Sequence, residues 1–244
     1  MATTMLNTQS LIDAELADEP FRWTHIPESF VSAQAADELR RDFPVEGFGR
    51  KQRRLAESSV SGGHYLNGRG LITRETGEIF RPDTLAPAWI ALAQDLLSDD
   101  YREAMSKLTG IDLTDTLLEA IVFRQPEGGY LDPHPDNPAK PVSQVFYFND
   151  SWSADYGGCL RILGSNDIDD VAAELMPDAG TSVVLVRSDD SWHGYLPVQG
   201  DHTRLSLQIF FCRPDMKFAT EYGPDWTKPP RITRPLRLDE ADGD

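Results

Sequence analysis

Two residues that could bind a metal ion, His134 and Asp136, stand two positions apart in the sequence. If residues 130–136 run extended, side chains two positions apart point to the same face, so the imidazole and the carboxylate converge. A second histidine, His193, could complete the set from another strand. Two imidazoles and one carboxylate on one side of an Fe(II) ion leave its remaining positions open for substrate and dioxygen. We therefore predict that these three residues bind iron.

A second chemical group follows eleven residues later, where Arg204 enters the apolar run 205–211. An arginine in a buried strand needs a partner, because an unpaired buried charge is very costly. Its planar guanidinium matches a carboxylate with two parallel hydrogen bonds, and the hydroxyl of Ser206 could add another from the same strand face. The sequence thus predicts a carboxylate receptor beside a metal site. A small diacid with a chelating end, such as 2-oxoglutarate, would bridge the two.

Residues 128–212 resemble the 2-oxoglutarate/Fe(II)-dependent dioxygenases, and most closely the prolyl 4-hydroxylase-like branch. The matching segments occur in the family's order and comprise residues 129–130, 134–138, 146–149 and 157–162, together with His193 and Arg204. The resemblance implies a double-stranded β-helix, or jelly roll, as the fold. It also implies that Tyr147 hydrogen-bonds the co-substrate, near Arg204 and Ser206.

Three details refine the resemblance. Phe123 stands where the oxygen-sensing prolyl hydroxylases have a tyrosine that contacts 2-oxoglutarate, so that contact is missing here. The spacing from His193 to Arg204 follows the His-x10-Arg-x-Ser pattern of the broader family instead. In related halogenases a small residue replaces the metal-binding carboxylate to admit chloride, so Asp136 favours hydroxylation.

The activity implied by the resemblance is hydroxylation of an unactivated C–H bond, with succinate and CO2 as co-products. The catalytic residues would be the metal ligands His134, Asp136 and His193. The implied cofactors are Fe(II) and 2-oxoglutarate, with ascorbate as a further candidate. The substrate class stays open between an amino-acid residue in a protein, a free amino acid and an amino-acid-derived small molecule.

Three other functions compete with this interpretation. A zinc hydrolase can also use two histidines and a carboxylate, but it does not explain Arg204 in an apolar strand. A non-catalytic cupin-like binding module needs no open coordination face beside a diacid receptor. A nucleic-acid demethylase of the same superfamily would share all three metal ligands, but the net charge of −17 disfavours a polyanionic partner.

The charge is spread unevenly along the 244 residues. Residues 40–81 carry nine Lys/Arg and five Asp/Glu, whereas the remainder is strongly acidic. This glycine-containing segment has no clear period, so we predict a long loop over residues 44–81, with a short hairpin within it as an alternative. Within it, residues 45–81 would be a lid whose basic residues 50, 51, 53 and 54 favour a substrate with a carboxylate. The alternative is a solvated insertion without a role.

The remaining composition fits a cytoplasmic protein that is a monomer or a homodimer. No stretch approaches the roughly 20 apolar residues of a membrane span, and the first ten residues lack the features of a signal peptide. The two cysteines, Cys159 and Cys212, lie in apolar segments and are expected to be buried free thiols.

The secondary structure must place these groups on strands. We expect a mainly β domain over residues 21–222, with a jelly-roll core at about 115–213, after a flexible segment 1–20 and before a tail 223–244. Predicted helices cover 32–41, 87–97 and 99–108, each supporting the outside of the sheet. Predicted strands cover residues 21–26, 117–124, 142–149, 158–163 and 183–187, and a final pair 192–198 and 204–212 joined by a turn.

Overall fold

The computed structural model describes residues 4–53 and 63–216, and its strands form one large antiparallel sheet. The strand order is β1-β9-β6-β11-β4-β3-β5-β10-β7-β8, and β2 pairs with β3 at the side of this path. The strands are β1 (Trp23–Ile26), β2 (Gly49–Arg53), β3 (His64–Ile72), β4 (Leu117–Gln125), β5 (Tyr130–His134), β6 (Val142–Tyr147), β7 (Leu160–Leu163), β8 (Val171–Leu175), β9 (Ser182–Val186), β10 (His193–Tyr195) and β11 (Arg204–Cys212).

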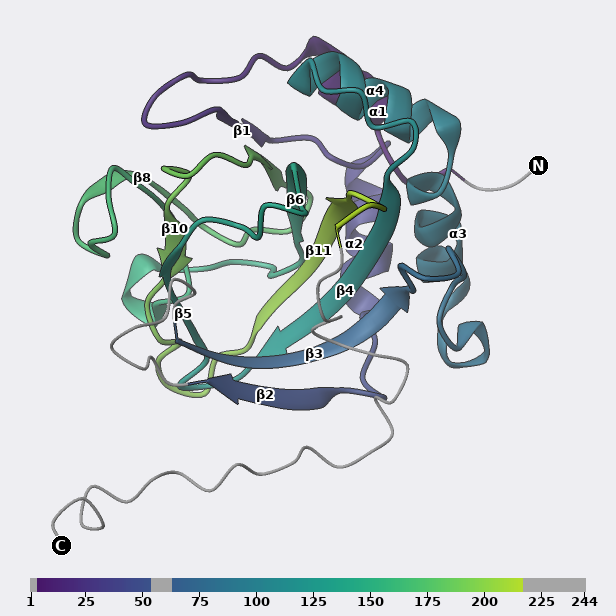
Figure 1. Ribbon diagram of the computed structural model, residues 1–244. Coiled ribbons are helices and arrows are strands. Elements are labelled where there is room, and N and C mark those ends of the chain that lie inside the picture. The colour runs from purple at the N-terminus through teal and green to yellow at the C-terminus, as the bar shows by residue number, and fades with distance from the viewer. Residues whose placement is uncertain (1–3, 54–62, 217–244) are drawn as a thin grey trace, which may run out of the picture.

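The sheet curls on itself, so that β5 and β10 face the layer formed by β6, β11 and β4 (Figure 1). Strand β3 joins the two layers. Its residues 64–65 pair with β5, and its residues 68–72 pair with β4. This curled, two-layered antiparallel sheet is the jelly roll that the sequence predicts, and it encloses an inner face between the layers.

Four helices pack on the outside of the sheet (Figure 1), namely α1 (Thr8–Asp13), α2 (Ala33–Arg41), α3 (Pro87–Leu96) and α4 (Asp99–Thr109). The capping residues explain two of their starts, because the hydroxyls of Ser32 and Ser98 accept backbone N–H groups of the first turn. Helix α4 ends at Gly110, whose φ of 66° is left-handed. The three helices predicted from the sequence are confirmed.

The main core lies between these helices and the sheet. Trp89 of α3 is fully buried against the rings of Phe43 and Phe148, with centroid distances of 5.2 Å to each, and its indole N–H donates to a backbone carbonyl of α2. Burying such aromatic surface is a large stabilising term, about 25 cal/mol per Å² of apolar area. Because this core covers the outer face of the sheet, the inner face remains available for a functional site.

The N-terminal segment differs from its prediction. Met5, Leu6 and Leu11 are buried in the main core, and Asp95 of α3 accepts hydrogen bonds from the backbone N–H groups of Met5 and Leu6. Residues 5–11 therefore pack against the core, which the expectation of a flexible segment did not include, whereas residues 12–20 are exposed or half-buried. Met5, Leu6 and Leu11 are spaced through a polar, acidic stretch without a clear period, so the sequence did not predict that they would be buried.

The segment 44–81 is more regular than a long loop, because residues 49–53 and 64–72 form an antiparallel pair of strands, as in the hairpin alternative. One of its glycines has a packing role. At Gly68 a Cβ atom would lie 2.8 Å from the ring of Phe123, so the missing side chain makes room for that ring on the neighbouring strand. The predicted lid falls partly on residues 54–62, which lie outside the described residues, as does the predicted tail 223–244.

The last two predicted strands exist but do not form a hairpin. Strand β10 pairs with β5 and β7, whereas β11 lies between β4 and β6. The turn after residue 198 therefore carries the chain from one layer to the other. Strand β8, with its largely exposed residues, was not predicted at all.

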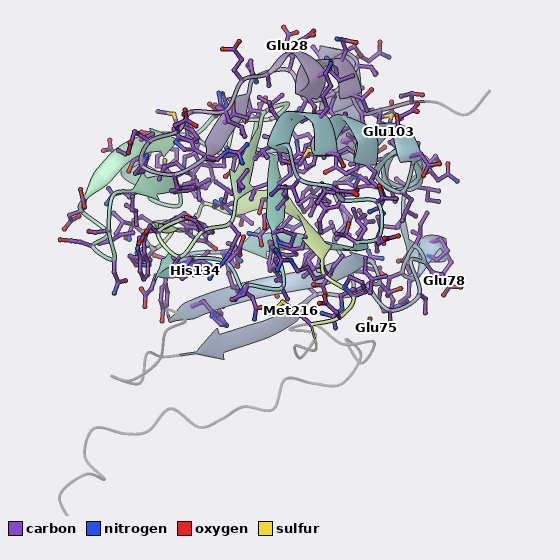
Figure 2. The ribbon with its side chains drawn as sticks, turned by 45° about the horizontal axis from the view of Figure 1, so that its top comes forward. Glu28, Glu75, Glu78, Glu103, His134 and Met216 are labelled. Atoms are coloured by element: carbon purple, nitrogen blue, oxygen red, sulfur yellow. The ribbon has the colours of Figure 1, made fainter. Side chains whose placement is uncertain are left out.

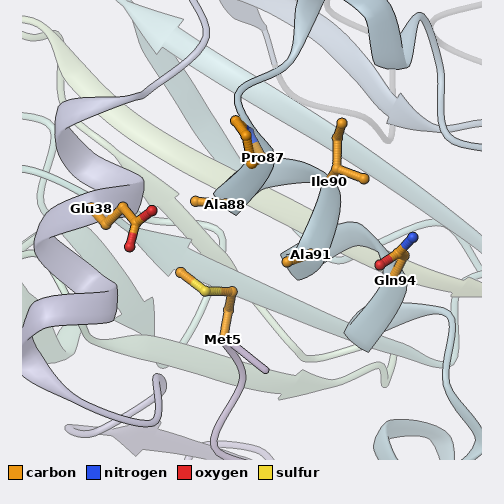
Figure 3. Close-up of a pocket in the computed structure, with 7 residues that line it drawn as sticks. All are labelled: Met5, Glu38, Pro87, Ala88, Ile90, Ala91 and Gln94. Carbon is orange, nitrogen blue, oxygen red and sulfur yellow. The ribbon is translucent and has the colours of Figure 1, made fainter. Parts of the chain in front are cut away.

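A hollow of about 290 Å³ opens on the helical side, between the segment around Met5, α2 and α3 (Figure 3). Glu38 is the only ionisable side chain among the described residues that line it. This hollow therefore lacks the cluster of ionisable side chains that a catalytic or metal-binding site would need. Among the described residues, no helix is long and apolar enough to cross a membrane.

Candidate active site

His134, Asp136 and His193 come together on the inner face, where β5 and β10 meet. His134 ends β5 and pairs directly with His193, which begins β10, while Asp136 lies two residues beyond the end of β5. One potential ligand atom from each side chain lies within 4.8 Å of the other two, and the two imidazole centroids are 4.6 Å apart. His134 lies well away from Glu103 of helix α4 (Figure 2).

Both imidazoles are oriented by their own backbone. Nδ1 of His134 lies 2.9 Å from the carbonyl oxygen of Asp132, and Nδ1 of His193 lies 2.9 Å from that of Ser191. A carbonyl can only accept a hydrogen bond, so each Nδ1 carries the proton and each Nε2 has the lone pair that a metal requires. The same two-residue spacing holds both rings, which makes them matching metal ligands.

Asp136 is held as an anion. Burial raises the pKa of its carboxyl, but the nearby charges of His193, Lys140 and His134, with a hydrogen bond from Ser143, outweigh this and lower the pKa. The Ser143 hydroxyl donates to Oδ2 at 2.5 Å. Two imidazoles, each held through Nδ1, and one carboxylate are a donor set that fits Fe(II).

Gly194 allows the two metal-bearing strands to approach. A Cβ atom at this position would lie 2.6 Å from the carbonyl oxygen of Leu131 on β5. The register of β10 against β5 also shifts between His193 and Tyr195. Only a residue without a side chain fits this close backbone contact, which sets the distance between the two histidines.

Arg204 lies on the same inner face and is 1% exposed. Its Nε donates to the carbonyl of Gly158 at 2.6 Å, and Nη1 donates to the Ser206 hydroxyl at 3.1 Å. Its guanidinium carbon lies 4.4 Å from the ring centroid of Tyr195 and 5.1 Å from that of Tyr147. Two of its five N–H donors are thus used by described residues, and a ligand can take the others.

One cavity connects the metal-binding residues to the arginine. His134, Asp136, His193 and Arg204 all line it. Its other lining residues are mainly apolar, namely Leu131, Ser143, Val145, Leu160, Leu185, Tyr195, Gln208 and Phe210. The cavity has a volume of about 30 Å³, roughly that of one water molecule, so a diacid that spans both ends requires the lining side chains to move.

The tyrosines beside Arg204 have hydroxyl groups without a partner. Tyr147, which the resemblance indicated, is fully buried, and burial raises its pKa to about 12. Tyr195 is 2% exposed, and burial likewise raises its pKa. Neither hydroxyl makes a hydrogen bond to any described residue. Tyr195 was missed from the sequence because only its position beside Arg204 distinguishes it.

Two other histidines do not belong to the metal-binding group. His25 is exposed on β1, and His202 is half-buried, with its ring stacked 3.6 Å from that of Tyr156. Cys159 and Cys212 are buried free thiols, as predicted. Phe123 is buried and belongs to the same hydrophobic cluster as Tyr195.

Comparison with known proteins places this site in a known context. Residues 120–212 match the model of the 2OG-Fe(II) oxygenase superfamily. Among curated proteins, the mouse prolyl 3-hydroxylase OGFOD1 is 25% identical over 150 residues. That match covers 60% of this chain and 26% of the relative, so the chain corresponds to about a quarter of its length.

Solved structures share the fold. A prolyl-4-hydroxylase from Pseudomonas putida superimposes with a TM-score of 0.56 at 24% identity, covering 78% of this chain and 92% of that one. A prolyl hydroxylase from Trichoplax adhaerens, solved with a peptide fragment of the hypoxia inducible factor oxygen degradation domain, gives a TM-score of 0.50 at 16% identity. It covers 78% of this chain and 83% of the other.

Proposed function

We propose that this chain, whose residues 120–212 match the model of the 2OG-Fe(II) oxygenase superfamily, is a hydroxylase in which His134, Asp136 and His193 bind Fe(II). The observation that carries the proposal is the single cavity lined by these three residues and by Arg204. A metal-binding group alone suits many reactions. A metal-binding group facing a buried arginine suits a co-substrate that chelates the metal and carries a second carboxylate.

Bound Fe(II) and 2-oxoglutarate supply the oxidation, in which O2 converts the co-substrate into succinate and CO2 and one oxygen atom enters a substrate C–H bond. The residues of this chain hold the reactants. Arg204 pairs with the distal carboxylate of 2-oxoglutarate. The Ser206 hydroxyl and the Tyr147 ring both contact the Arg204 guanidinium, so their hydroxyls can reach the same carboxylate. The apolar lining of the cavity excludes water from the reaction.

Asp136 and its neighbours keep the metal-binding group ready. The lowered pKa of Asp136 keeps it ionised at neutral pH, so metal binding does not have to displace a proton from it. The backbone acceptors of the two imidazoles fix the tautomer that binds a metal. These arrangements reduce the reorganisation needed when the metal enters.

For the prime substrate we propose an amino-acid residue in a peptide, with a prolyl residue as the first candidate. Support comes from the names of the relatives, which include prolyl 3- and 4-hydroxylases and one enzyme solved with a peptide. A free amino acid or a small molecule derived from one is the alternative. The acidic chain, with a formal charge of −17, disfavours the nucleic-acid demethylases of the superfamily.

The test is succinate formation from 2-oxoglutarate with Fe(II) under air, measured by mass spectrometry. The proposal expects turnover that requires both Fe(II) and 2-oxoglutarate and that stops when Asp136 is changed to alanine. A proline-containing peptide library, screened for a gain of one oxygen atom, then tests the substrate. Succinate formation that is stimulated only by a free amino acid would support the alternative substrate class.

Two results would contradict the proposed activity. Hydrolysis of a substrate with Zn(II) and without 2-oxoglutarate would indicate a metal hydrolase instead. Binding of a small diacid without any turnover, in protein with a full equivalent of Fe(II), would indicate a non-catalytic binding module.

A further inference from the structure

Three buried polar groups beside Arg204 have no hydrogen-bond partner among the described residues, and only one of them, the Tyr147 hydroxyl, belongs to the proposed co-substrate receptor. Gln125 pairs with Arg204 across β4 and β11, and its side chain is 1% exposed. Its Nε2 has no hydrogen-bond partner among the described residues, like the hydroxyls of Tyr147 and Tyr195. Three unpartnered buried polar groups in one place are costly unless a ligand satisfies them.

The orientation of the Gln125 amide is fixed by the fold. Its Oε1 accepts a hydrogen bond of 2.8 Å from the backbone N–H of Asn67 on β3. Asn67 lies where β3 stops pairing with β5 and begins pairing with β4, so its N–H has no partner in either ladder. Because the oxygen of the amide is committed to this N–H, the NH2 group must point the other way.

Gln125 and Tyr195 lie close to one another. The guanidinium carbon of Arg204 lies 4.4 Å from the centroid of the Tyr195 ring, and Gln125 is the residue paired with Arg204 on the neighbouring strand, so both side chains flank Arg204. The Tyr195 ring also stacks against the guanidinium and lines the cavity that leads to the metal-binding residues. The hydroxyl therefore lies within the space where the proposed co-substrate would end.

We propose that Tyr195 donates a hydrogen bond to the distal carboxylate of 2-oxoglutarate and that Gln125 orients it. Tyr195 is then a binding residue, and Gln125 a positioning residue. A carboxylate has about four lone-pair sites, so it can accept from Arg204, Tyr147 and Tyr195 together. The inference rests on the proposed function, and it makes the arginine end of the cavity selective for a diacid.

The experiment compares two ligands that differ only at this end. 2-Oxopentanoate has the same five-carbon chain as 2-oxoglutarate, with a methyl group in place of the distal carboxylate. Isothermal titration calorimetry with the Mn(II)-loaded protein gives both dissociation constants without turnover. For Tyr195→Phe we expect about a ten- to hundredfold weaker binding of 2-oxoglutarate and nearly unchanged binding of 2-oxopentanoate.

Two further variants separate this role from a structural one. Gln125→Glu keeps the acceptor for Asn67 but replaces the NH2 group by a carboxylate oxygen, so it should also weaken 2-oxoglutarate selectively. Tyr101→Phe is the matched control, because Tyr101 is fully buried but donates its hydroxyl to Gln144 on the helical side. It should lower the melting temperature and leave the ratio of the two dissociation constants unchanged.

The outcomes distinguish this inference from the proposed function. Equal weakening of both ligands in Tyr195→Phe would show a packing role and overturn the inference, as would unchanged binding of 2-oxoglutarate. If the wild-type protein loaded with metal does not bind 2-oxoglutarate, the proposed function fails and the inference falls with it.

Discussion

The hydroxyl of Ser143 donates a 2.5 Å hydrogen bond to the carboxylate of Asp136, across the gap between β6 and the segment that follows β5. The bond orients the carboxylate and satisfies one of its oxygens. It also contributes to the lowered pKa of Asp136. The carboxylate is therefore positioned from the layer opposite to the two histidines.

Ser143→Ala should weaken metal binding about ten- to a hundredfold, the usual effect of losing a group that orients a ligand. Titration with Mn(II) would measure the affinity. Ser182→Ala is the control, because Ser182 is a buried serine that hydrogen-bonds to Ser29 and Gln144, not to a metal-binding residue. Equal losses in both variants would indicate a general packing effect.

His193→Ala should remove turnover and most of the metal affinity, since it deletes one of three ligands. His202→Ala serves as a histidine control, because its ring stacks on Tyr156 away from the metal-binding group. Metal content measured after dialysis against a known concentration of Fe(II) reports the affinity directly. Normal activity of His193→Ala would refute its assignment as a ligand.

Arg204→Ala should weaken 2-oxoglutarate binding more than about a hundredfold, because breaking a buried Arg–carboxylate pair typically costs about 3–5 kcal/mol. Arg161→Ala is the matched control, as Arg161 pairs with Glu174 and Asp169 at the sheet edge. The Michaelis constant for 2-oxoglutarate is the readout. If it were the same in Arg204→Ala as in the wild type, the arginine would serve only the fold.

Gly194→Ala should reduce metal affinity even though residue 194 is not a ligand. The added methyl group would lie 2.6 Å from the carbonyl oxygen of Leu131, so β10 must move away from β5 and carry His193 with it. A Mn(II) titration, with circular dichroism melting as a check on folding, would measure this. Unchanged metal affinity would show that the strands can separate without moving the histidine.

The two thiols should make the protein less stable at alkaline pH. Burial raises the pKa of Cys159 to about 11 and that of Cys212 to about 12, whereas an unfolded cysteine has a pKa of about 8.5. Stability is thus full below about pH 8.5 and falls as the pH rises, because the unfolded chain ionises first. Each thiol should lower the free energy of unfolding by about 1 kcal/mol at about pH 9.5.

Urea unfolding at pH 7.5 and 9.5 would test this. The loss of unfolding free energy between the two values should shrink when Cys159 and Cys212 are both changed to alanine. If the double variant loses as much stability as the wild type, other groups control the alkaline transition. Labelling by a thiol reagent should be slow in the native protein and fast in urea.

Local signals predicted three of the four helices and most strands of the described residues. Helices α2 and α4 follow from the capping serines Ser32 and Ser98, because a cap acts within one turn of the chain. The partners of β10 could not be predicted in this way. Its three residues pair with β5 and β7, and that choice depends on how distant strands stack, not on the short turn that follows.

The candidate site was predictable where residue type is unusual. A histidine and an aspartate two positions apart, and an arginine in an apolar strand, stand out against their surroundings. Gln125 and Tyr195 do not, because a glutamine at a strand end and a tyrosine near a turn are common. Their relation to Arg204 arises only when β4, β10 and β11 are brought together.

The central position of β11 has a consequence for how the protein is made. Strand β11 is the last strand among the described residues, yet it lies between β4 and β6, which precede it by about 60 to 80 residues. A nascent chain that has passed residue 193 already contains all three proposed metal ligands, but β4 and β6 still lack their shared neighbour. Translation thus completes the metal ligands before the sheet can close, and folding must await the last strand.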